Sequence, residues 1–225
     1  MKIWLKFGKT ERLRYVSHLD LQRFMQRALN RTELPIAWSQ GFNPHPLMSF
    51  GSAMAMGWTS EYEVLDIRMA KDVSAQEAAK QMAAALPPDL PVLAARVLDD
   101  RKSAPMALLT AADYMIAVEG VDGAKIVEQI DEYMAKEHVI AMRKTKTGEK
   151  EADIREMTHI LKPDLREGNI FYARLNLTER ATLKPDLLVR ELAKMAGAEE
   201  PEIRVHRLSL LGQNDKGEMK PLMEL

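Results

Sequence analysis

Three arginines at helical spacing are the first residues of this sequence that could do chemistry. Arg23, Arg27 and Arg31 follow one another at intervals of four, so on an α-helix they share one edge. Such a row of like charges is mildly repulsive, and no fold requires it. Guanidinium groups pair with phosphates and carboxylates and stack on bases, so the row favours binding to a nucleic-acid backbone or another polyanion. The alternative is a solvated helix face on which Asp20 pairs with Arg23.

The second group is the segment Ser39–Pro46 (SQGFNPHP), which joins a glycine, two prolines, a histidine and an aromatic ring. Gly41 permits a positive φ, and the prolines stiffen the chain on both sides of His45. A side chain held in this way loses little entropy when it binds a ligand. Phe42 and the nearby Trp38 are side chains of the kind that stacks on a base. The alternative is a turn whose Phe42 packs into the core.

These observations define two sets of candidates. Acid–base chemistry would fall to His18, Asp20 and His45, although capping of a helix also explains Ser17 and Asp20. No paired-histidine motif, Walker loop or GxSxG motif occurs, so we expect no metal site and no cofactor. The candidates for binding nucleic acid or another anion are Arg14, Arg23, Arg27, Arg31, Trp38, Gln40, Phe42, Asn43 and His45.

Composition narrows the possible functions. The chain has no Cys, which excludes disulfides, thiolate zinc sites, cysteine nucleophiles and cysteine-held iron–sulfur clusters within it. It has no apolar run of about 18 residues and no secretion signal at its start, so we expect a cytoplasmic location and no membrane contact. Residues 1–60 hold eight Lys and Arg against three Asp and Glu, whereas the remainder holds 24 against 30. This asymmetry indicates either an anionic partner for the N-terminal part or an uneven solvated surface.

The hydrophobic periodicity predicts an α+β fold. The predicted order is strand, helix, strand, strand, helix, strand, twice over, which is the order of a ferredoxin-like (split βαβ) unit. We therefore predict two tandem ferredoxin-like units. The first, residues 1–100, carries the basic helix and the Gly/Pro/His loop. The second, residues 106–225, has an extra strand in a hairpin insertion whose tip contains Thr147-Gly148, and the polar segment Asp99–Pro105 separates the two.

The predicted elements follow from that pattern. Strands are predicted at residues 1–7, 35–39, 61–69, 92–98, 114–118, 139–144, 154–161, 170–177 and 203–211. Residues 47–55 are either a strand or irregular. Helices are predicted at residues 18–31, 75–86, 122–136 and 185–196, with Ser17 and Ser74 as N-caps of the first two.

The block Arg14–Leu21 (RYVSHLDL), continued by the arginines, Leu34-Pro35 and the loop Ser39–Pro46, resembles the bacterial family of radical-SAM-linked proteins. In that family the block occurs in a small protein encoded beside a radical SAM enzyme, or as the C-terminal extension of one. The resemblance covers about Arg14–Asp66. Leu47 departs from the pattern, because members often carry a basic residue after the second proline. Since this chain has no Cys, the resemblance implies the accessory part, with a radical SAM enzyme as partner.

Three functions remain open at this point. The first is an RNA-binding module that holds tRNA or rRNA for modification by a radical SAM enzyme. The second is a protein-interaction subunit of such an enzyme, without nucleic-acid contact. The third is a metal-independent RNase that uses His18 and His45 as acid and base. The sequence favours a chain with no activity of its own but does not decide whether it is an enzyme.

Overall fold

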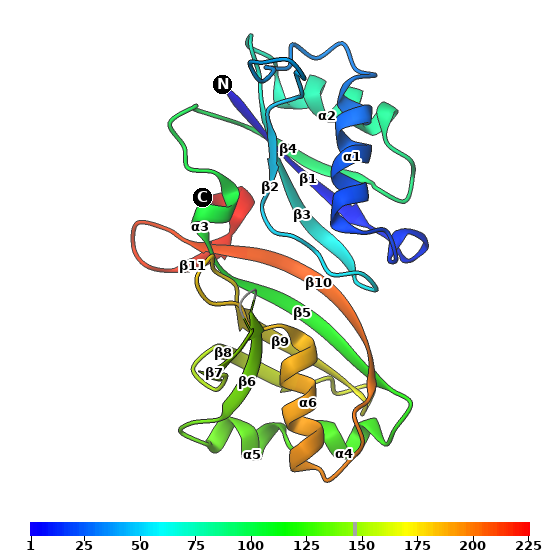
Figure 1. Cartoon of the computed structure of the whole chain (residues 1–225), viewed down its shortest axis with the longest axis vertical. Helices are drawn as coiled ribbons and strands as arrows, with labels where there is room; N and C mark the ends of the chain where they lie inside the picture. The colour runs from blue at the N-terminus through cyan, green and yellow to red at the C-terminus, as the bar shows by residue number, and fades with distance from the viewer. Residues whose placement is uncertain (146–147) are drawn as a thin grey trace. The chain divides into compact units, whose positions relative to one another are not determined.

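The computed structural model describes residues 1–145 and 148–225, which form two compact units (Figure 1). Unit 1 comprises residues 1–109 and 209–225, and unit 2 comprises residues 110–208. The fold is of the predicted α+β class. The predicted segment 106–225 therefore does not coincide with one unit, because its last part returns to unit 1. None of the helices in the described ranges has the length and apolar character needed to cross a membrane.

Unit 1 is built on antiparallel pairs among β1, β2, β3 and β4, with two main helices. β1 pairs with both β3 and β4, and β2 pairs with β3. β10 also adjoins β3, and β11 pairs with β10. The elements are β1 (Lys2–Lys9), η1 (Glu11–Leu13), α1 (His18–Leu29), β2 (Met48–Phe50), β3 (Thr59–Arg68), α2 (Ala75–Ala85), β4 (Val92–Leu98), α3 (Pro105–Leu108), β10 (Glu202–Gln213, with 209–213 in this unit), β11 (Met219–Pro221) and η2 (Leu222–Glu224).

The side chains of β1 point alternately to the two faces of the sheet, and both faces are buried at this strand. Ile3 and Leu5 belong to a core cluster with Met25 of α1 and Met82 of α2. Trp4, on the other face, is also fully buried. On the C-terminal side of the chain, the backbone N–H of Met223 donates to the Tyr62 hydroxyl at 3.0 Å and its carbonyl accepts from Arg96 at 2.8 Å. The turn η2 is thereby bonded to β3 and β4.

Unit 2 likewise combines antiparallel strand pairs with helices. β9 pairs with β5 and with β8, and β10 adjoins β5. β6 and β7 form a separate two-stranded sheet. The elements are β5 (Leu109–Glu119), α4 (Gly123–Val127), α5 (Ile130–Ala135), β6 (Ile140–Thr145), β7 (Gly148–Asp153), β8 (Thr158–Pro163), β9 (Ile170–Asn176), α6 (Pro185–Met195) and the first part of β10.

Several element predictions were wrong in detail. Residues 35–39 form isolated bridges from Ile36 to Met69 and from Trp38 to Pro46 rather than a strand, since Pro35 lacks the N–H that a sheet ladder needs. The helix predicted at 122–136 is two short helices, and the strand predicted at 154–161 begins at Thr158. Thr147 of the predicted hairpin tip lies outside the described residues.

Gly212 provides a test of how β10 packs against Leu108 at the end of α3. A Cβ at this position would lie 2.5 Å from the backbone oxygen of Leu108, which a side-chain rotation cannot relieve. We expect Gly212→Ala to lower the free energy of unfolding by about 1–3 kcal/mol. Urea denaturation followed by circular dichroism measures it. Gly168→Ala is the matched control, because its Cβ would meet only Ala124 at an ordinary 3.8 Å. Equal stability of the two variants would contradict the packing described for β10.

Candidate functional site

The N-terminus of α1 is closed by a reciprocal cap. The Ser17 hydroxyl oxygen accepts from the Asp20 backbone N–H at 3.2 Å and donates to the Asp20 carboxylate at 2.7 Å. The other oxygen of Asp20 lies 3.4 Å from Arg23. The predicted N-cap at Ser17 is confirmed, and the contacts of Asp20 are those of a capping residue rather than of a catalytic acid.

A buried lysine holds the turn that leads into α1. Lys9 is only 1% exposed, and its ammonium donates to the carbonyls of Arg14 and Val16 at 3.0 and 3.1 Å. The carbonyl of Arg14 also accepts from the backbone N–H of Gly57 at 2.8 Å. This turn, and with it the start of the helix, is therefore tied to the end of β1 and to the segment before β3.

The four candidate arginines have unequal freedom. Arg14 pairs with Glu11 and lies over the Tyr15 ring. Arg31 donates to the carbonyl of Ala85 at 2.8 Å, so it satisfies a backbone oxygen at the end of α2. The side chain of Arg23 is 68% exposed, and its one described ion pair is a long contact of 3.4 Å with Asp20. Arg27 is exposed and has no hydrogen bond or ion pair with any residue in the described ranges.

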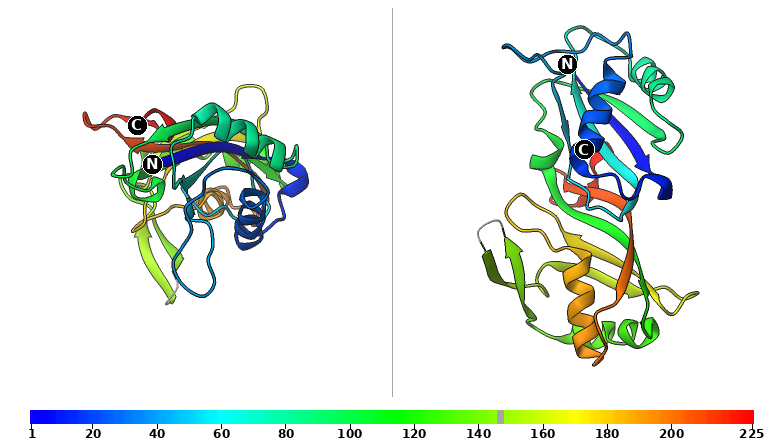
Figure 2. Two further views of the ribbon diagram at one scale, coloured as in Figure 1. Left: turned by 90° about the horizontal axis from the view of Figure 1, so that it is seen from above. Right: turned by 45° about the vertical axis from the view of Figure 1, so that its right-hand side comes forward.

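Residues 37–47 form a small hairpin whose rungs are hydrogen-bonded. The N–H of Leu47 donates to Ala37 and that of Ser39 to His45, both at 2.9 Å. The Ser39 hydroxyl also lies 2.9 Å from Nδ1 of His45 and accepts from its backbone N–H at 3.0 Å. His45 is therefore fixed in orientation while its ring stays exposed. Figure 2 shows the chain around residue 40 projecting from the body of unit 1.

The tip of this hairpin presents an aromatic ring to solvent. Gly41 has φ +123°, a conformation that suits glycine alone. Phe42 beside it is 105% exposed, and Trp38 at the base is 43% exposed. Gln40 and Asn43 are exposed as well. The alternative in which Phe42 packs into the core is thus wrong.

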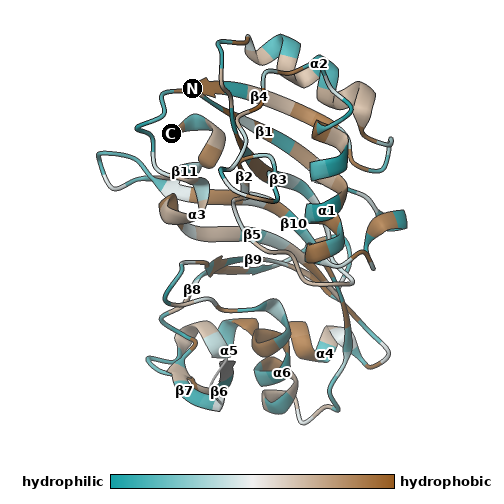
Figure 3. Ribbon diagram, turned by 45° about the horizontal axis from the view of Figure 1, so that its top comes forward, coloured by the Kyte–Doolittle hydropathy of each residue, from teal (hydrophilic) through white to brown (hydrophobic). Residues whose placement is uncertain are grey.

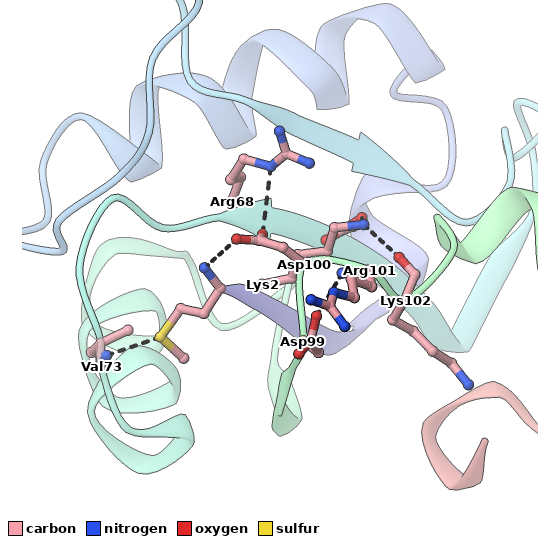
Figure 4. A network of polar contacts seen from close by, with 9 residues as sticks. Lys2, Arg68, Val73, Asp99, Asp100, Arg101 and Lys102 are labelled. Atoms are coloured by element: carbon pink, nitrogen blue, oxygen red, sulfur yellow. Dashed lines mark hydrogen bonds and ion pairs between the residues drawn. The ribbon is translucent and has the colours of Figure 1, made fainter.

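The base of the hairpin is attached to β3 next to a network of charges. Arg68 accepts from the N–H of Ala37 and donates its own N–H to Leu47, both at 2.9 Å. Its guanidinium lies 3.7 Å from Asp100, whose other oxygen is 2.8 Å from the N-terminal amine (Figure 4). These cations lower the pKa of the Asp100 carboxyl, the amine by its hydrogen bond most of all. The network anchors the strand end that carries the hairpin.

His18 is the first residue of α1. Its ring meets Phe50 edge-on at 5.0 Å between centroids, and its buried Nδ1 has no hydrogen-bond partner in the described structure. Among the described contacts, those of His18 go to Phe50 and those of His45 go to Ser39 and Asn43, and none joins the two histidines.

We name the exposed residues Arg23, Arg27, Trp38, Gln40, Phe42, Asn43 and His45 the α1–hairpin surface. Figure 3 shows hydrophilic residues along the outer side of α1. Arg14 and Arg31 are left out of it because their guanidinium groups already serve the protein.

Sequence reasoning missed an apolar group at the start of α1. Tyr15, Leu19 and Met56 are 65%, 62% and 60% exposed. Tyr15 and Leu19 are four residues apart, and Met56 precedes Gly57, which bonds Arg14. The spacing of the first two was a detectable signal, since Leu19 falls off the buried stripe of the helix. Met56 is brought to this group by the hydrogen bond between Gly57 and Arg14, which joins distant segments and has no local pattern in the sequence.

One group of ligand-type side chains lies in unit 2. Single donor atoms of His138, Asp153 and Glu156 lie within 4.8 Å of one another, and no ion is present. Asp153 already accepts from the backbone N–H groups of Val139 and Arg155, both at 3.0 Å, and lies 2.6 Å from His138. These bonds account for the cluster as a support for the turn after β7.

The half-buried position of His18 predicts an acid sensitivity. Burial lowers the pKa of this imidazole below its ordinary value, so the folded protein favours the neutral ring. The stabilisation is present above about pH 6.5, the unfolded-state value, and is lost as the pH falls through the lower folded-state value. We expect His18→Gln to reduce the loss of stability between pH 7.5 and 5, measured by urea denaturation. The exposed His45→Gln is the control, and an unchanged pH dependence in His18→Gln would contradict this account.

Among the matches to solved structures, one has a TM-score above 0.5 and shows a similar fold. One match is a chain in the "Crystal Structure of a Cbf5-Nop10-Gar1 Complex", at 10% identity and a TM-score of 0.51, covering 92% of this chain. This chain spans about half of that one, 48% of its length. Another is an unknown protein from Galdieria sulphuraria, at 15% identity and a TM-score of 0.28, covering 92% and 97% of the two chains.

The sequence itself gives the family. No curated protein matches the chain. Residues 2–185 match the model of a protein family, and this range includes α1, the hairpin and most of unit 2. The chain therefore belongs to the family described as "Uncharacterized protein conserved in bacteria (DUF2344)".

Proposed function

We propose that the α1–hairpin surface binds RNA, and that the protein is an accessory module of a radical SAM enzyme in tRNA or rRNA modification. The observation that carries this proposal is the complete exposure of Phe42 on a hydrogen-bonded hairpin. Exposure of a phenyl ring to water is unfavourable, and a partner that buries the ring gains that free energy. Because the hairpin already holds the ring in place, little conformational entropy is lost on binding. Stacking on an unpaired base is one such use.

The charges of the same surface support a nucleic-acid partner. Arg27 is exposed without a pairing carboxylate among the described residues, and Arg23 keeps only a contact of 3.4 Å with Asp20. Guanidinium groups that the fold does not use are available to phosphates. The exposed Gln40 and Asn43 add amide groups that suit base edges and sugars.

The radical SAM partner rests on the resemblance of the block Arg14–Pro46 and on the absence of Cys from the chain. We also interpret each unit as ferredoxin-like. In unit 1 the pairings of β1 with β3 and β4, and of β2 with β3, have the directions of a split βαβ unit. Unit 2 has the same order when β6 and β7 are taken as an insertion.

A protein-interaction subunit is the second candidate function. The exposed Tyr15, Leu19 and Met56 favour it, because large apolar side chains gathered on a surface suit a protein interface. The same group is compatible with the first proposal, in which it would face the partner enzyme while the hairpin faces RNA. The RNase alternative has no comparable support, since no described contact joins His18 to His45.

Phe42 and Arg27 separate the two functions experimentally. We expect Phe42→Ala to weaken binding of a fluorescein-labelled single-stranded tRNA loop by about 1–3 kcal/mol, through lost stacking. Arg27→Ala is expected to reduce the slope of log Kd against log salt concentration by about 0.7. Fluorescence anisotropy of the full chain measures both effects.

The matched control is Arg180→Ala, an exposed arginine of unit 2, which should leave both quantities unchanged. If neither Phe42→Ala nor Arg27→Ala changed binding, the α1–hairpin surface would not be the RNA site. Loss of a copurifying protein on Leu19→Ser, without any RNA binding by the wild type at low salt, would establish the second function in place of the first.

A further inference from the structure

The sheet of unit 2 has a polar face that the proposed function leaves unused. Along β9 the side chains of Phe171, Ala173 and Leu175 are fully buried, whereas the alternating Tyr172 and Arg174 are half-buried. Neighbouring side chains point to opposite faces of a strand. Tyr172 and Arg174 therefore share the face opposite to the apolar core of this unit.

A bidentate ion pair fixes the centre of this polar face. Nε and Nη2 of Arg174 donate to the two carboxylate oxygens of Asp113, at 2.7 and 3.0 Å. Nη2 also lies 3.3 Å from the Tyr172 hydroxyl. Burial, with Asp113 beside it, raises the pKa of the Tyr172 phenol to about 12, so the ring stays neutral. The phenol is thus uncharged, and its hydroxyl is held by the contact with Arg174.

Beside this phenol lies a hollow of about 400 Å³. Its volume falls within the range of about 300–1,000 Å³ that small-molecule sites occupy. Tyr172, Met115 and Leu165 supply apolar surface, and Leu165 is 98% exposed. A flat ring placed here would cover Leu165 and stack beside the phenol.

Two cations border the hollow, Lys162 and Arg166. Both are exposed, and neither side chain has a hydrogen bond or ion pair within the described part of the chain. The carboxylate of Asp164 between them accepts from the N–H groups of Arg166 and Glu167, at 2.7 and 3.2 Å. One carboxylate oxygen of Asp164 is therefore bonded to the backbone of the loop, and no described ion pair joins this carboxylate to Lys162 or Arg166.

We propose that this hollow takes a nucleobase of single-stranded RNA, with the adjoining phosphate bound by Lys162 and Arg166. An aromatic wall, an apolar floor and two unpaired cations together match a ring joined to a phosphate. This inference rests on the RNA binding proposed above and adds a second contact to it.

The experiment maps contacts by crosslinking. The full chain is irradiated with a single-stranded RNA that carries 4-thiouridine, and separately with 4-thiouridine monophosphate, and the modified peptides are identified by mass spectrometry. We expect crosslinks from both probes within residues 162–172. Absence of crosslinks there from either probe would overturn the inference, whatever is found at Phe42.

Binding measurements give an independent readout. Lys162→Ala with Arg166→Ala should weaken RNA binding about tenfold and lower the salt slope by about 1.4, the value for two contacts to a single strand. Arg180→Ala with Lys184→Ala removes the same charge from exposed positions of unit 2 and should change neither. Tyr172→Phe keeps the ring and should bind as the wild type does, whereas Tyr172→Leu should lose about tenfold.

The two proposals fail in different ways. Loss of RNA affinity in the Arg27 and Phe42 variants, with none in the Lys162 and Arg166 variant, would leave the α1–hairpin surface and overturn the hollow. The reverse result would keep the hollow and overturn the α1–hairpin surface. Saturable binding of an acidic peptide, in place of both nucleotide probes, would assign the hollow to a protein partner and overturn the inference.

Discussion

The burial of both faces of β1 is the constraint on which unit 1 depends. Ile3 and Leu5 on one face and Trp4 on the other are all at 0% exposure. A strand that is apolar on both faces needs cover on both. α1 and α2 supply it on one side, and the position of α1 then follows from its own pattern. With Leu21 and Met25 turned into the core, the edge that carries Arg23 and Arg27 faces solvent. The exposure of Arg23 and Arg27 therefore follows from the way α1 covers β1.

Local signals in the sequence predicted the parts of the site that depend on local chemistry. The cap at Ser17, the helical row of arginines and the special conformation of Gly41 all follow from spacings of a few residues. They could be read without a fold, because each rests on a hydrogen bond or a φ angle within one turn. The α+β class followed in the same way from periods of two and 3.6 residues.

The rest of the site depends on contacts between distant segments. Arg31 belongs to the row by spacing, yet its guanidinium caps Ala85, 54 residues away. Lys9 reads as an ordinary basic residue at the end of a strand, but it is buried under the turn before α1. The sequence predicted a strand followed by a loop at residues 37–47, where the structure has a hairpin. Its two arms are joined by isolated bonds rather than by a regular ladder, and the second arm contains Pro44 and Pro46. The cluster of Asp113 and Arg174 joins residues 61 positions apart and had no local signal.

The return of residues 209–225 to unit 1 affects the order in which the chain can mature during synthesis. Tyr62 and Arg96 obtain their partner at Met223 only after every residue of unit 2 has been made. A ribosome adds about 5–20 residues per second, so these groups wait for roughly 6–30 seconds on a nascent chain. Unit 2, whose residues 110–208 are contiguous, has no such delay. Unit 1, whose synthesis begins first, therefore forms its contacts with η2 only after unit 2 has been synthesised.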